Sequence, residues 1–396
     1  MKMASYKKPK FLTYYFFKFL CVIVSKLFFN LKIKRNELKK KKGPYLVIAN
    51  HQSIMDFINA YAAIPTRTHF VLSYSFYNTA GFKKTMDNIG CIPKQQFQTT
   101  VKEMMQMKNV ITNNMPLAIY PVGIMTENGM STNPGPSIAT LLKFLETDVY
   151  IAKSEGAYLT YPKWSKKIRK GRVYLDIYKA LSKEQVKTLS SEQLYDILAM
   201  NLKYNDYNFS AINHIKYKNG NNVEGLNYVL YQCPDCNSEY SITSKKDTLT
   251  CSNCGYTVKA NKYGLLSLIK GSTHYKKPSD WYLDMQAMLA NKIKHTSDYA
   301  FVANGKILMI NSKNKFEEVG YGTVTLNKQN IILDGTINNE QVKIVLTTSS
   351  YPLLPFKPGH HVELQKEKEI YRIKFDNPYD CSKFNMVLKE FNQNKN

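Results

Sequence analysis

The chain has 396 residues, and its 55 Lys and Arg against 30 Asp and Glu give a formal net charge of +25 at pH 7. This length predicts two or three domains, each able to bury its own core. The charge argues against cationic partners and favours anionic ones: a membrane surface, an acidic carrier protein or nucleic acid. Seven cysteines, four of them in one ordered cluster, do not fit a secreted disulfide framework and indicate a reducing cytosol.

Residues 1–42 predict a basic, apolar segment that associates with a membrane. They carry thirteen Lys and Arg and a single acid, Glu37. Residues 11–31 are strongly apolar and aromatic, but Lys18 and Lys26 leave no uncharged run of about 18 residues for a spanning helix. We expect a helix in the plane of the lipid headgroups, with both lysines on one basic side. A core helix with two snorkelling lysines is the alternative.

Residues 43–205 predict an α/β domain with a mixed sheet and covering helices, because strand and helix patterns alternate. The expected strands are 45–49, 69–73, 117–120, 148–152 and 172–178. One helix is expected to begin near residue 56, and three more are expected over 82–88, 99–113 and 137–146. Capping boxes at Ser182 and Ser190 predict the start of two further helices. A basic loop over 162–172 contains Trp164, and it fits either contact with lipid phosphates or an acidic donor, or a solvated turn.

A histidine and a carboxylate follow the first of these strands. The sequence Asn50-His51-Gln52-Ser53-Ile54-Met55-Asp56 comes directly after the apolar run 45–49. One turn of chain can bring Asp56 onto the imidazole, so that one ring nitrogen stays protonated and the other is free as a base. A lone histidine in a loop is often an ordinary structural residue, which is the alternative for His51.

Three stretches together resemble a known family. Asn-His-x-x-x-x-Asp after a strand resembles the first motif of the glycerolipid acyltransferases of the lysophosphatidate (1-acylglycerol-3-phosphate) type. Residues 117–123 are similar to that family's apolar strand ending in Phe-Pro-Glu-Gly, and residues 90–97 occupy the place of its second motif. The resemblance covers roughly the first half of the chain.

The resemblance implies that His51 deprotonates an acceptor hydroxyl, which attacks an acyl thioester directly while Asp56 orients the imidazole. Acyl-CoA and acyl carrier protein are both compatible donors, and a lysophospholipid is the implied acceptor. The tetrahedral oxyanion needs donors, for which backbone N–H groups near Gly123 are one candidate. Pro121 and Gly123 are the implied substrate-binding residues of the third motif.

The third motif departs from the family pattern. Val122 stands for the family's glutamate and Met125 for its arginine, and neither can pair with a hydroxyl or a phosphate. Three explanations stay open. The acceptor lacks the usual phosphate, or Arg67 and Lys94 supply the binding charge instead, or the site is degenerate.

Two Cys-x-x-Cys pairs predict a metal site. Fourteen residues separate the pair Cys233 and Cys236 from the pair Cys251 and Cys254. This spacing places four thiolates around one tetrahedral Zn²⁺, in a closed structural site, with paired disulfides as the alternative. We therefore expect a linker over 206–229 and a zinc ribbon over 230–262.

Residues 263–396 predict a helix followed by a β-rich domain. The helix fits 279–294, and Asn304-Gly305 predicts a hairpin turn between strands 300–303 and 306–310. Five more strands and a helix over 382–391 complete the outline of a pleckstrin-homology-like barrel, which implies a lipid- or protein-binding module. The further strands are 322–326, 330–333, 342–347, 361–364 and 370–375.

The complete sequence therefore predicts an O-acyltransferase of lipid metabolism at the cytoplasmic face of a membrane. Its expected partners are a phospholipid surface, a thioester donor and a lysophospholipid acceptor, while nucleic acid is not expected. The alternative is a catalytically degenerate scaffold that binds lipid or nucleic acid through the zinc ribbon and the β-rich domain.

Overall fold

The computed structural model describes residues 7–79, 83–95, 100–218, 222–367 and 369–393. Three predicted segments extend beyond the described residues. The helices 82–88 and 99–113 begin outside them, at Phe82 and Thr99, and the stretch 90–97 ends outside them, at residues 96–97. The chain divides into two compact units. Unit 1 contains Met1–Pro162 and Ile168–Lys218, and unit 2 contains Lys163–Lys167 and Asn219–Asn396.

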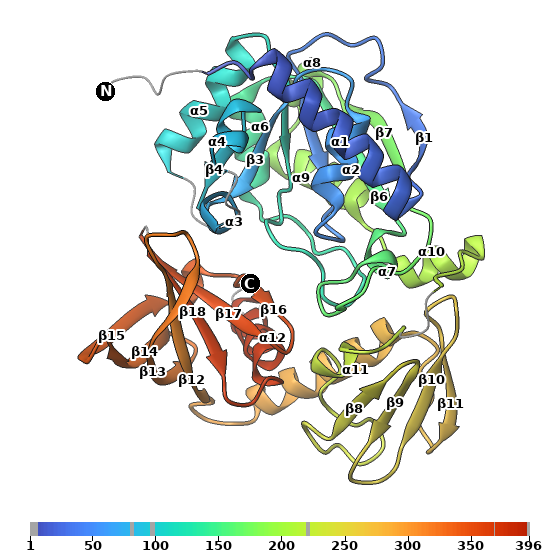
Figure 1. Cartoon of the computed structure of the whole chain (residues 1–396), viewed down its shortest axis with the longest axis vertical. Helices are drawn as coiled ribbons and strands as arrows, with labels where there is room; N and C mark the ends of the chain where they lie inside the picture. The colour runs from blue at the N-terminus through green and yellow to red at the C-terminus, as the bar shows by residue number, and fades with distance from the viewer. Residues whose placement is uncertain (1–6, 80–82, 96–99, 219–221, 368, 394–396) are drawn as a thin grey trace. The chain divides into compact units, whose positions relative to one another are not determined.

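Unit 1 is built on a seven-stranded mixed sheet of order β1-β7-β6-β2-β5-β3-β4 (Figure 1). The strands from β6 to β4 run parallel, β7 is antiparallel to β6, and β1 is parallel to β7. A mixed sheet was expected, so this part of the prediction is confirmed. The bounds are β1 Lys32–Asn36, β2 Leu46–Ala49, β3 His69–Ser73, β4 Ile92–Lys94, β5 Leu117–Ile119, β6 Val149–Glu155 and β7 Tyr174–Leu181.

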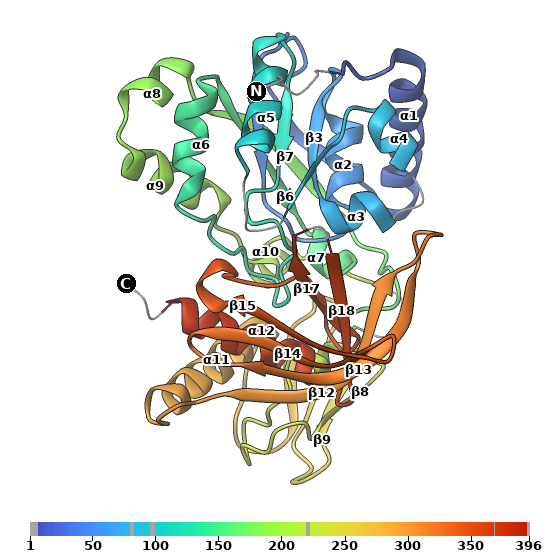
Figure 2. The same ribbon diagram turned by 90° about the vertical axis from the view of Figure 1, so that its left-hand side faces the viewer.

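Helices cover both faces of this sheet, because successive side chains of a strand point to opposite faces. Val47 and Ala49 of β2 join the core under α1 and α2, whereas Leu46 and Ile48 join the core under α5, α6, α8 and α9. Figure 2 shows these two helical layers on either side of the strands. The helices are α1 Phe11–Phe29, α2 Asp56–Ala63, α3 Tyr74–Thr79, α4 Lys83–Asn88, α5 Val101–Thr112, α6 Ser137–Leu145, α7 Ala157–Thr160, α8 Lys183–Thr188, α9 Ser191–Leu202 and α10 Asp206–Asn213.

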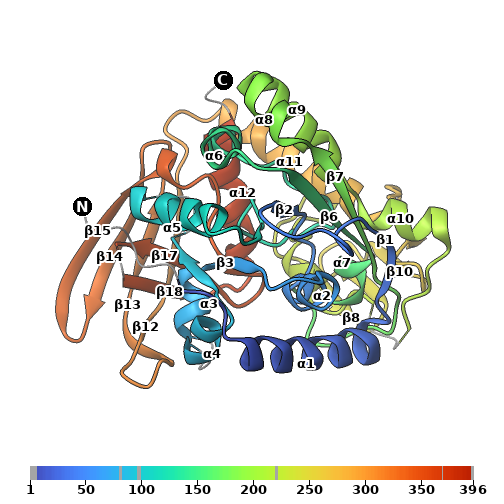
Figure 3. The same cartoon turned by 90° about the horizontal axis from the view of Figure 1, so that it is seen from above.

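Helix α1 lies along the outside of α2 (Figure 3). Its Tyr14 is fully buried, packs on Tyr61 with 4.8 Å between ring centroids, and donates to the carbonyl of Thr66. The opposite side of α1 is an exposed apolar face. This face consists of Phe11, Leu12, Tyr15, Phe16, Phe19, Leu20, Ile23, Leu27 and Phe28.

The two lysines of α1 do not share a basic side as expected. Lys18 is turned inward and donates to the carbonyl of Ile64, while Lys26 is exposed. Eight residues advance a helix by about 80° beyond two full turns, which is enough to separate the two side chains. Among the described residues, α1 is the helix that is long and apolar enough to cross a membrane by length and composition, with 17% of the apolar window buried.

Three local features of residues 1–218 differ from expectation or refine it. The strand β1, with the polar sequence Lys-Ile-Lys-Arg-Asn, pairs with β7 at the edge of the sheet and was not predicted. Helix α10 occupies part of the segment 206–229 that was expected to be a linker. In the basic loop, Trp164 and Arg169 are buried, at 4% and 3% exposed, whereas Lys166, Lys167 and Lys170 are exposed, so the choice between lipid contact and a solvated turn stays a prediction for these lysines.

Unit 2 contains two sheets. The first has the order β11-β10-β9-β8 and carries the four cysteines at its end, and the second has the order β15-β14-β13-β12-β18-β17-β16. Helix α11, Pro278–Lys294, follows the first sheet, and α12, Asp380–Gln393, ends the second. The strands are β8 Ile242–Lys245, β9 Thr248–Cys251, β10 Thr257–Ala260, β11 Leu266–Lys270, β12 Phe301–Ile310, β13 Phe316–Leu326, β14 Asn330–Ile337, β15 Glu340–Thr347, β16 Phe356–Lys357, β17 His361–Lys366 and β18 Glu369–Phe375.

The predicted hairpin turn at Asn304-Gly305 is wrong. Both residues lie inside the continuous strand β12, which pairs with β13 and β18. A Cβ on Gly305 would lie 2.4 Å from the carbonyl oxygen of Lys374, so the glycine permits a close approach of two backbones. Gly305 therefore serves the packing of neighbouring strands and does not form a turn. The β-rich character of the domain is as expected.

The two sheets of unit 2 are joined through α12. Tyr240 donates to Asp380 at 2.7 Å, and Lys383 forms an ion pair with Glu239. The hydroxyl of Tyr379 also donates to the carbonyl of Ile242 at 2.6 Å. Helix α12 therefore couples the cysteine-bearing sheet to the seven-stranded sheet.

Candidate active site and cysteine cluster

The end of β2 positions the histidine of the first motif. All four residues of β2 are buried, and the strand lies between β5 and β6. Beyond it, the buried amide of Asn50 donates to the carbonyl of Ser154 at 2.8 Å and accepts from the Ser154 N–H at 2.7 Å. This paired contact fixes the backbone immediately before His51.

Asp56 is held in one orientation by four donors. Its side chain is 2% exposed at the first residue of α2. Oδ2 accepts from the backbone N–H groups of Gln52 and Ser53 at 2.5 and 2.8 Å and lies 3.1 Å from His51 Nδ1. Oδ1 accepts from the Ser154 hydroxyl at 3.1 Å. A carboxylate with these partners at a helix N-terminus is well placed to orient the ring.

The contact with Asp56 occupies Nδ1 of His51 and leaves Nε2 as the ring nitrogen for a substrate. The side chain of His51 is 19% exposed. Its second face packs on Tyr120, with 4.7 Å between the ring centroids. Burial raises the pKa of Tyr120 well above its usual value, and the charge of Asp56 acts in the same direction, so this phenol stays neutral.

A small pocket opens beside His51. The loop after β5 forms much of its wall and is attached to the histidine, because the Thr126 N–H donates to the carbonyl of His51 at 3.1 Å. A second attachment comes from Gln52, whose side-chain amide donates to the Ser131 hydroxyl at 3.1 Å. The lining residues are Asn50, His51, Val122, Ile124, Thr126, Ser131, Thr132 and Leu202.

The structure brings only some of the predicted site residues together. Pro121 and Gly123 lie in the same loop as the pocket residues Val122 and Ile124, and Gly123 has φ +74°. The Gly123 N–H donates to the carbonyl of Tyr120 at 3.0 Å, so it is already used and is a poor candidate for an oxyanion donor.

The two predicted cations are held away from this pocket lining. Arg67 donates to the carbonyl of Pro9 at 3.1 Å and lies 5.7 Å from the ring centroid of Phe11. Lys94 donates to the carbonyl of Gln95 at 3.0 Å, and its burial lowers its pKa. Neither residue lines the pocket.

Sequence reasoning missed two residues of the site. Asn50 and Ser154 hold the histidine and the carboxylate in place. The position of Asn50 next to His51 was a usable signal, whereas Ser154 is more than one hundred positions away from Asn50 and gave none.

Comparison with known proteins agrees with this geometry. The family model described as "Acyltransferase" matches residues 30–152, which include His51, Asp56 and the loop after β5. Residues 30–152 are an acyltransferase domain. The resemblance stated from the sequence is thereby confirmed for this segment, and the roles of the individual residues stay predictions.

Two further comparisons were made with the whole chain. No curated protein matches the chain. Among solved structures, the chain is similar to the crystal structure of the 1-acyl-sn-glycerophosphate (LPA) acyltransferase PlsC from Thermotoga maritima. The identity is 17%, the match covers 48% of this chain and 77% of that chain, and the TM-score is 0.41.

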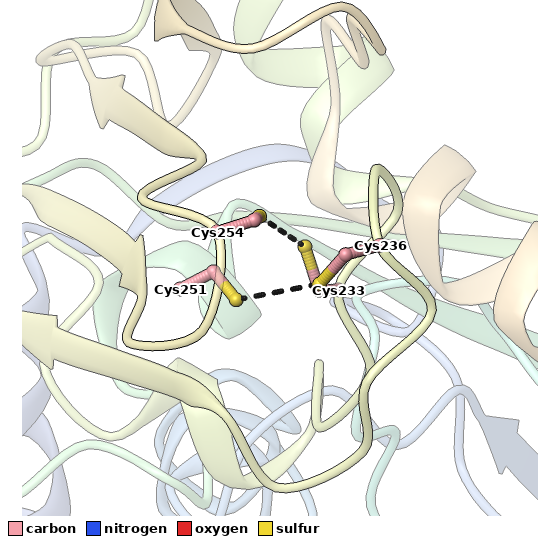
Figure 4. A group of neighbouring side chains, drawn as sticks. All are labelled: Cys233, Cys236, Cys251 and Cys254. Atoms are coloured by element: carbon pink, nitrogen blue, oxygen red, sulfur yellow. Dashed lines mark hydrogen bonds between the residues drawn. The ribbon is translucent and has the colours of Figure 1, made fainter.

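The four predicted cysteines form one cluster in unit 2 (Figure 4). All four Sγ atoms lie within 4.8 Å of one another, with 3.6 Å between Cys233 and Cys254 and 3.8 Å between Cys236 and Cys251. None of them forms a disulfide, so the alternative of paired disulfides is not supported. The cluster can hold a metal ion, as expected from the spacing.

Proposed function

We propose that the chain transfers a fatty acyl group from a thioester donor to the hydroxyl of a lysophospholipid or related glycerolipid, with His51 as general base. The observation that carries the proposal is the His51–Asp56 contact of 3.1 Å beside a pocket, within an acyltransferase domain. The donor is acyl-CoA or acyl carrier protein. The net charge of +25 suits the phosphates of CoA as well as an acidic carrier.

In the proposed reaction, His51 Nε2 takes the proton of the acceptor hydroxyl as its oxygen attacks the thioester carbonyl. The new C–O bond forms, the C–S bond breaks, and the imidazolium returns the proton to the leaving thiolate, which is released as a thiol. Asp56 stabilises the imidazolium while it exists. Proton removal must accompany C–O bond formation because a glycerol hydroxyl is a very weak acid, so positioning of both reactants provides much of the acceleration.

The proposed ion in the cysteine cluster is a structural Zn²⁺. Tetrahedral zinc with Zn–S bonds of 2.3 Å requires sulfur–sulfur distances of about 3.8 Å, which the two measured pairs approach. The side-chain amide of Asn253 donates to Cys236 Sγ at 3.5 Å, a contact that would stabilise a metal-bound thiolate. Four protein ligands leave no open position, so the ion would support unit 2 and take no part in catalysis.

The proposed location is the cytoplasmic face of a membrane. The exposed apolar face of α1 is suited to insertion among acyl chains, and exposed Lys26 can reach the phosphates. The proposal of the cytoplasmic side is supported by the seven cysteines, all of which are free of disulfides.

The test is acyl transfer by the purified full-length chain, with lysophosphatidate and a panel of other glycerolipid acceptors, each offered with acyl-CoA and with acyl carrier protein. Product ester is measured by mass spectrometry and released thiol by a colorimetric reagent, in equal amounts if the reaction is direct. Transfer with at least one donor and acceptor is expected. No transfer to any acceptor by a folded, zinc-loaded protein that still binds vesicles would favour the degenerate scaffold.

A further inference from the structure

We infer that the pocket beside His51 accepts a lipid alcohol whose polar end is uncharged, such as a monoacylglycerol, and does not accept a phosphomonoester. This inference rests on the proposed function and specifies the class of acceptor within it. It is carried by the chemistry of the pocket lining, by the fixed position of the loop that supplies it and by the partners of the candidate cations.

The pocket lining has no fixed charge among the described residues. Val122, Ile124 and Leu202 are apolar, and Asn50, Thr126, Ser131 and Thr132 are neutral and polar, which leaves His51 as the titratable group. Hydroxyl and amide groups of this kind can exchange hydrogen bonds with a glycerol moiety. They provide no positive charge to offset the two negative charges of a phosphomonoester.

The loop that supplies this lining is tied down along its length. Beyond the contact of Thr126 with His51, the Ser131 N–H donates to the carbonyl of Tyr204 at 2.9 Å. Between them, Gly129 has φ +81°, and a Cβ there would lie 2.9 Å from the ring of Tyr158. The loop is therefore fixed over residues 126–131, and the segment that carries Val122 and Ile124 is held at its start by the Gly123 N–H, which donates to the carbonyl of Tyr120.

The cations that were expected to bind phosphate have other partners. Arg67 is bonded to the carbonyl of Pro9, and Lys94 to that of Gln95. Residues 80–82 and 96–99 lie outside the described part of unit 1, and the sequence contains no Lys or Arg in either stretch. These two internal gaps thus add no cation to the site, and the undescribed residues 1–6 contain one, Lys2.

The uncharged lining predicts different kcat/KM values for two acceptors that differ only in a phosphate group. A phosphomonoester placed against Val122 and Ile124 would lose hydration without gaining an ion pair, which disfavours it strongly. A monoacylglycerol presents only hydroxyl groups, which can bond to Ser131 and Thr132. We therefore expect the neutral acceptor to be used about 100-fold more efficiently in kcat/KM.

The experiment compares 1-oleoylglycerol with 1-oleoyl lysophosphatidate, which differ only in the phosphate. The full-length chain is assayed with oleoyl-CoA in the same mixed micelles, and kcat/KM is measured for each acceptor. Preference for 1-oleoylglycerol supports the inference. Equal use of the two, or preference for lysophosphatidate, overturns it and leaves the proposed acyl transfer intact.

A matched pair of variants tests the cause. Ile124→Arg introduces a cation into the lining, and Ile124→Met is its neutral control. The arginine is expected to shift the kcat/KM ratio toward lysophosphatidate by about tenfold or more, and the methionine is expected to leave the ratio unchanged. An unchanged ratio in both variants contradicts the inference.

A binding readout keeps the inference testable if the chain transfers no acyl group. His51 is partly exposed, so its carbethoxylation by diethyl pyrocarbonate can be followed by mass spectrometry of the peptide that contains it. The inference predicts that 1-oleoylglycerol protects His51 at concentrations at which lysophosphatidate does not. Equal or reversed protection overturns it. If no acyl transfer is detected, the activity assay rejects the proposed function, and the protection assay still decides which class of lipid the pocket binds.

Discussion

At the scale of single residues, the proposed mechanism depends on a carboxylate that takes no direct part in bond formation. Asp56 accepts four hydrogen bonds, and one of them sets the orientation of His51. The pair was predictable from the sequence because both residues are close together after an apolar strand. The support from Ser154 was not predictable, because a contact between distant strands leaves no local signal.

The variant Asp56→Asn tests this positioning role. An amide cannot accept hydrogen bonds on both of its terminal atoms, so the ring of His51 should lose its preferred tautomer. We expect kcat to fall by about 10²–10⁴-fold with a circular dichroism spectrum like that of the wild type. Asp176→Asn, which removes a half-buried partner of Arg35, is the control and should retain activity. Loss of less than a factor of three in Asp56→Asn would argue against a positioning role.

A second residue-scale feature is His361 in β17. It is largely buried, with Nε2 3.7 Å from Glu363, and its neighbour His360 has its Nδ1 2.7 Å from Nδ1 of His361. Burial lowers the pKa of His361 to about 2, with the charge of Arg372 as the next cause. The remaining charges that lower it are those of His360, Lys357 and Lys374.

His361 should therefore make unit 2 sensitive to acid. The unfolded histidine has a pKa near 6.5, so the unfolded state binds the extra proton first, and stability falls as the pH drops below about 6.5. Between pH 7.5 and pH 5 the loss from this group is about 2 kcal/mol. In urea unfolding at both values, His361→Gln should lose about that much less than the wild type. Identical losses would show that His361 does not contribute.

At the scale of elements, local patterns predicted interior strands and capped helices well and predicted edges and close contacts poorly. The strand β2 and the capping boxes of α8 and α9 are where the sequence placed them. β1 was missed because an exposed edge strand has no apolar alternation. The Asn304-Gly305 turn was wrong because a glycine required by a neighbouring backbone looks the same in sequence as a turn glycine.

The element with the clearest expected effect on location is α1. Phe16 and Phe19 are both more than half exposed on its apolar face. Removing both aromatic rings should weaken binding to anionic vesicles by roughly tenfold or more, because a buried Phe contributes about 1.5–3 kcal/mol. The double variant Phe16→Ser/Phe19→Ser is measured by vesicle sedimentation. Met200→Ser, in an exposed part of α9, is the control, and equal binding by both would exclude α1 as the attachment.

At the scale of the whole molecule, the chain combines an acyltransferase domain with a unit that contains a β-rich sheet and a cysteine cluster able to hold a metal ion. The cysteine spacing predicted the cluster fully, since metal ligands must follow a narrow geometry. The attachment of that cluster to α12 through Tyr240 and Lys383 was not predictable, because it depends on tertiary packing.

Removal of zinc should therefore affect more than the ribbon. Purified protein is expected to contain about one Zn²⁺ per chain by mass spectrometry of the metal content. Chelation, or the variant Cys236→Ser, should lower the Tm of unit 2 and increase proteolysis near α12. Cys91→Ser removes a cysteine outside the cluster and should keep the zinc. Full zinc content in Cys236→Ser would contradict the four-cysteine site.

The central claim is that His51 is the base of an acyl transfer reaction. The most direct measurement is the rate of ester formation by the full-length wild type, by His51→Ala and by His274→Ala, which alters an exposed histidine of unit 2. We predict a loss of about 10³-fold or more in His51→Ala, with unchanged vesicle binding, and wild-type rates in His274→Ala. An active His51→Ala variant would contradict the mechanism.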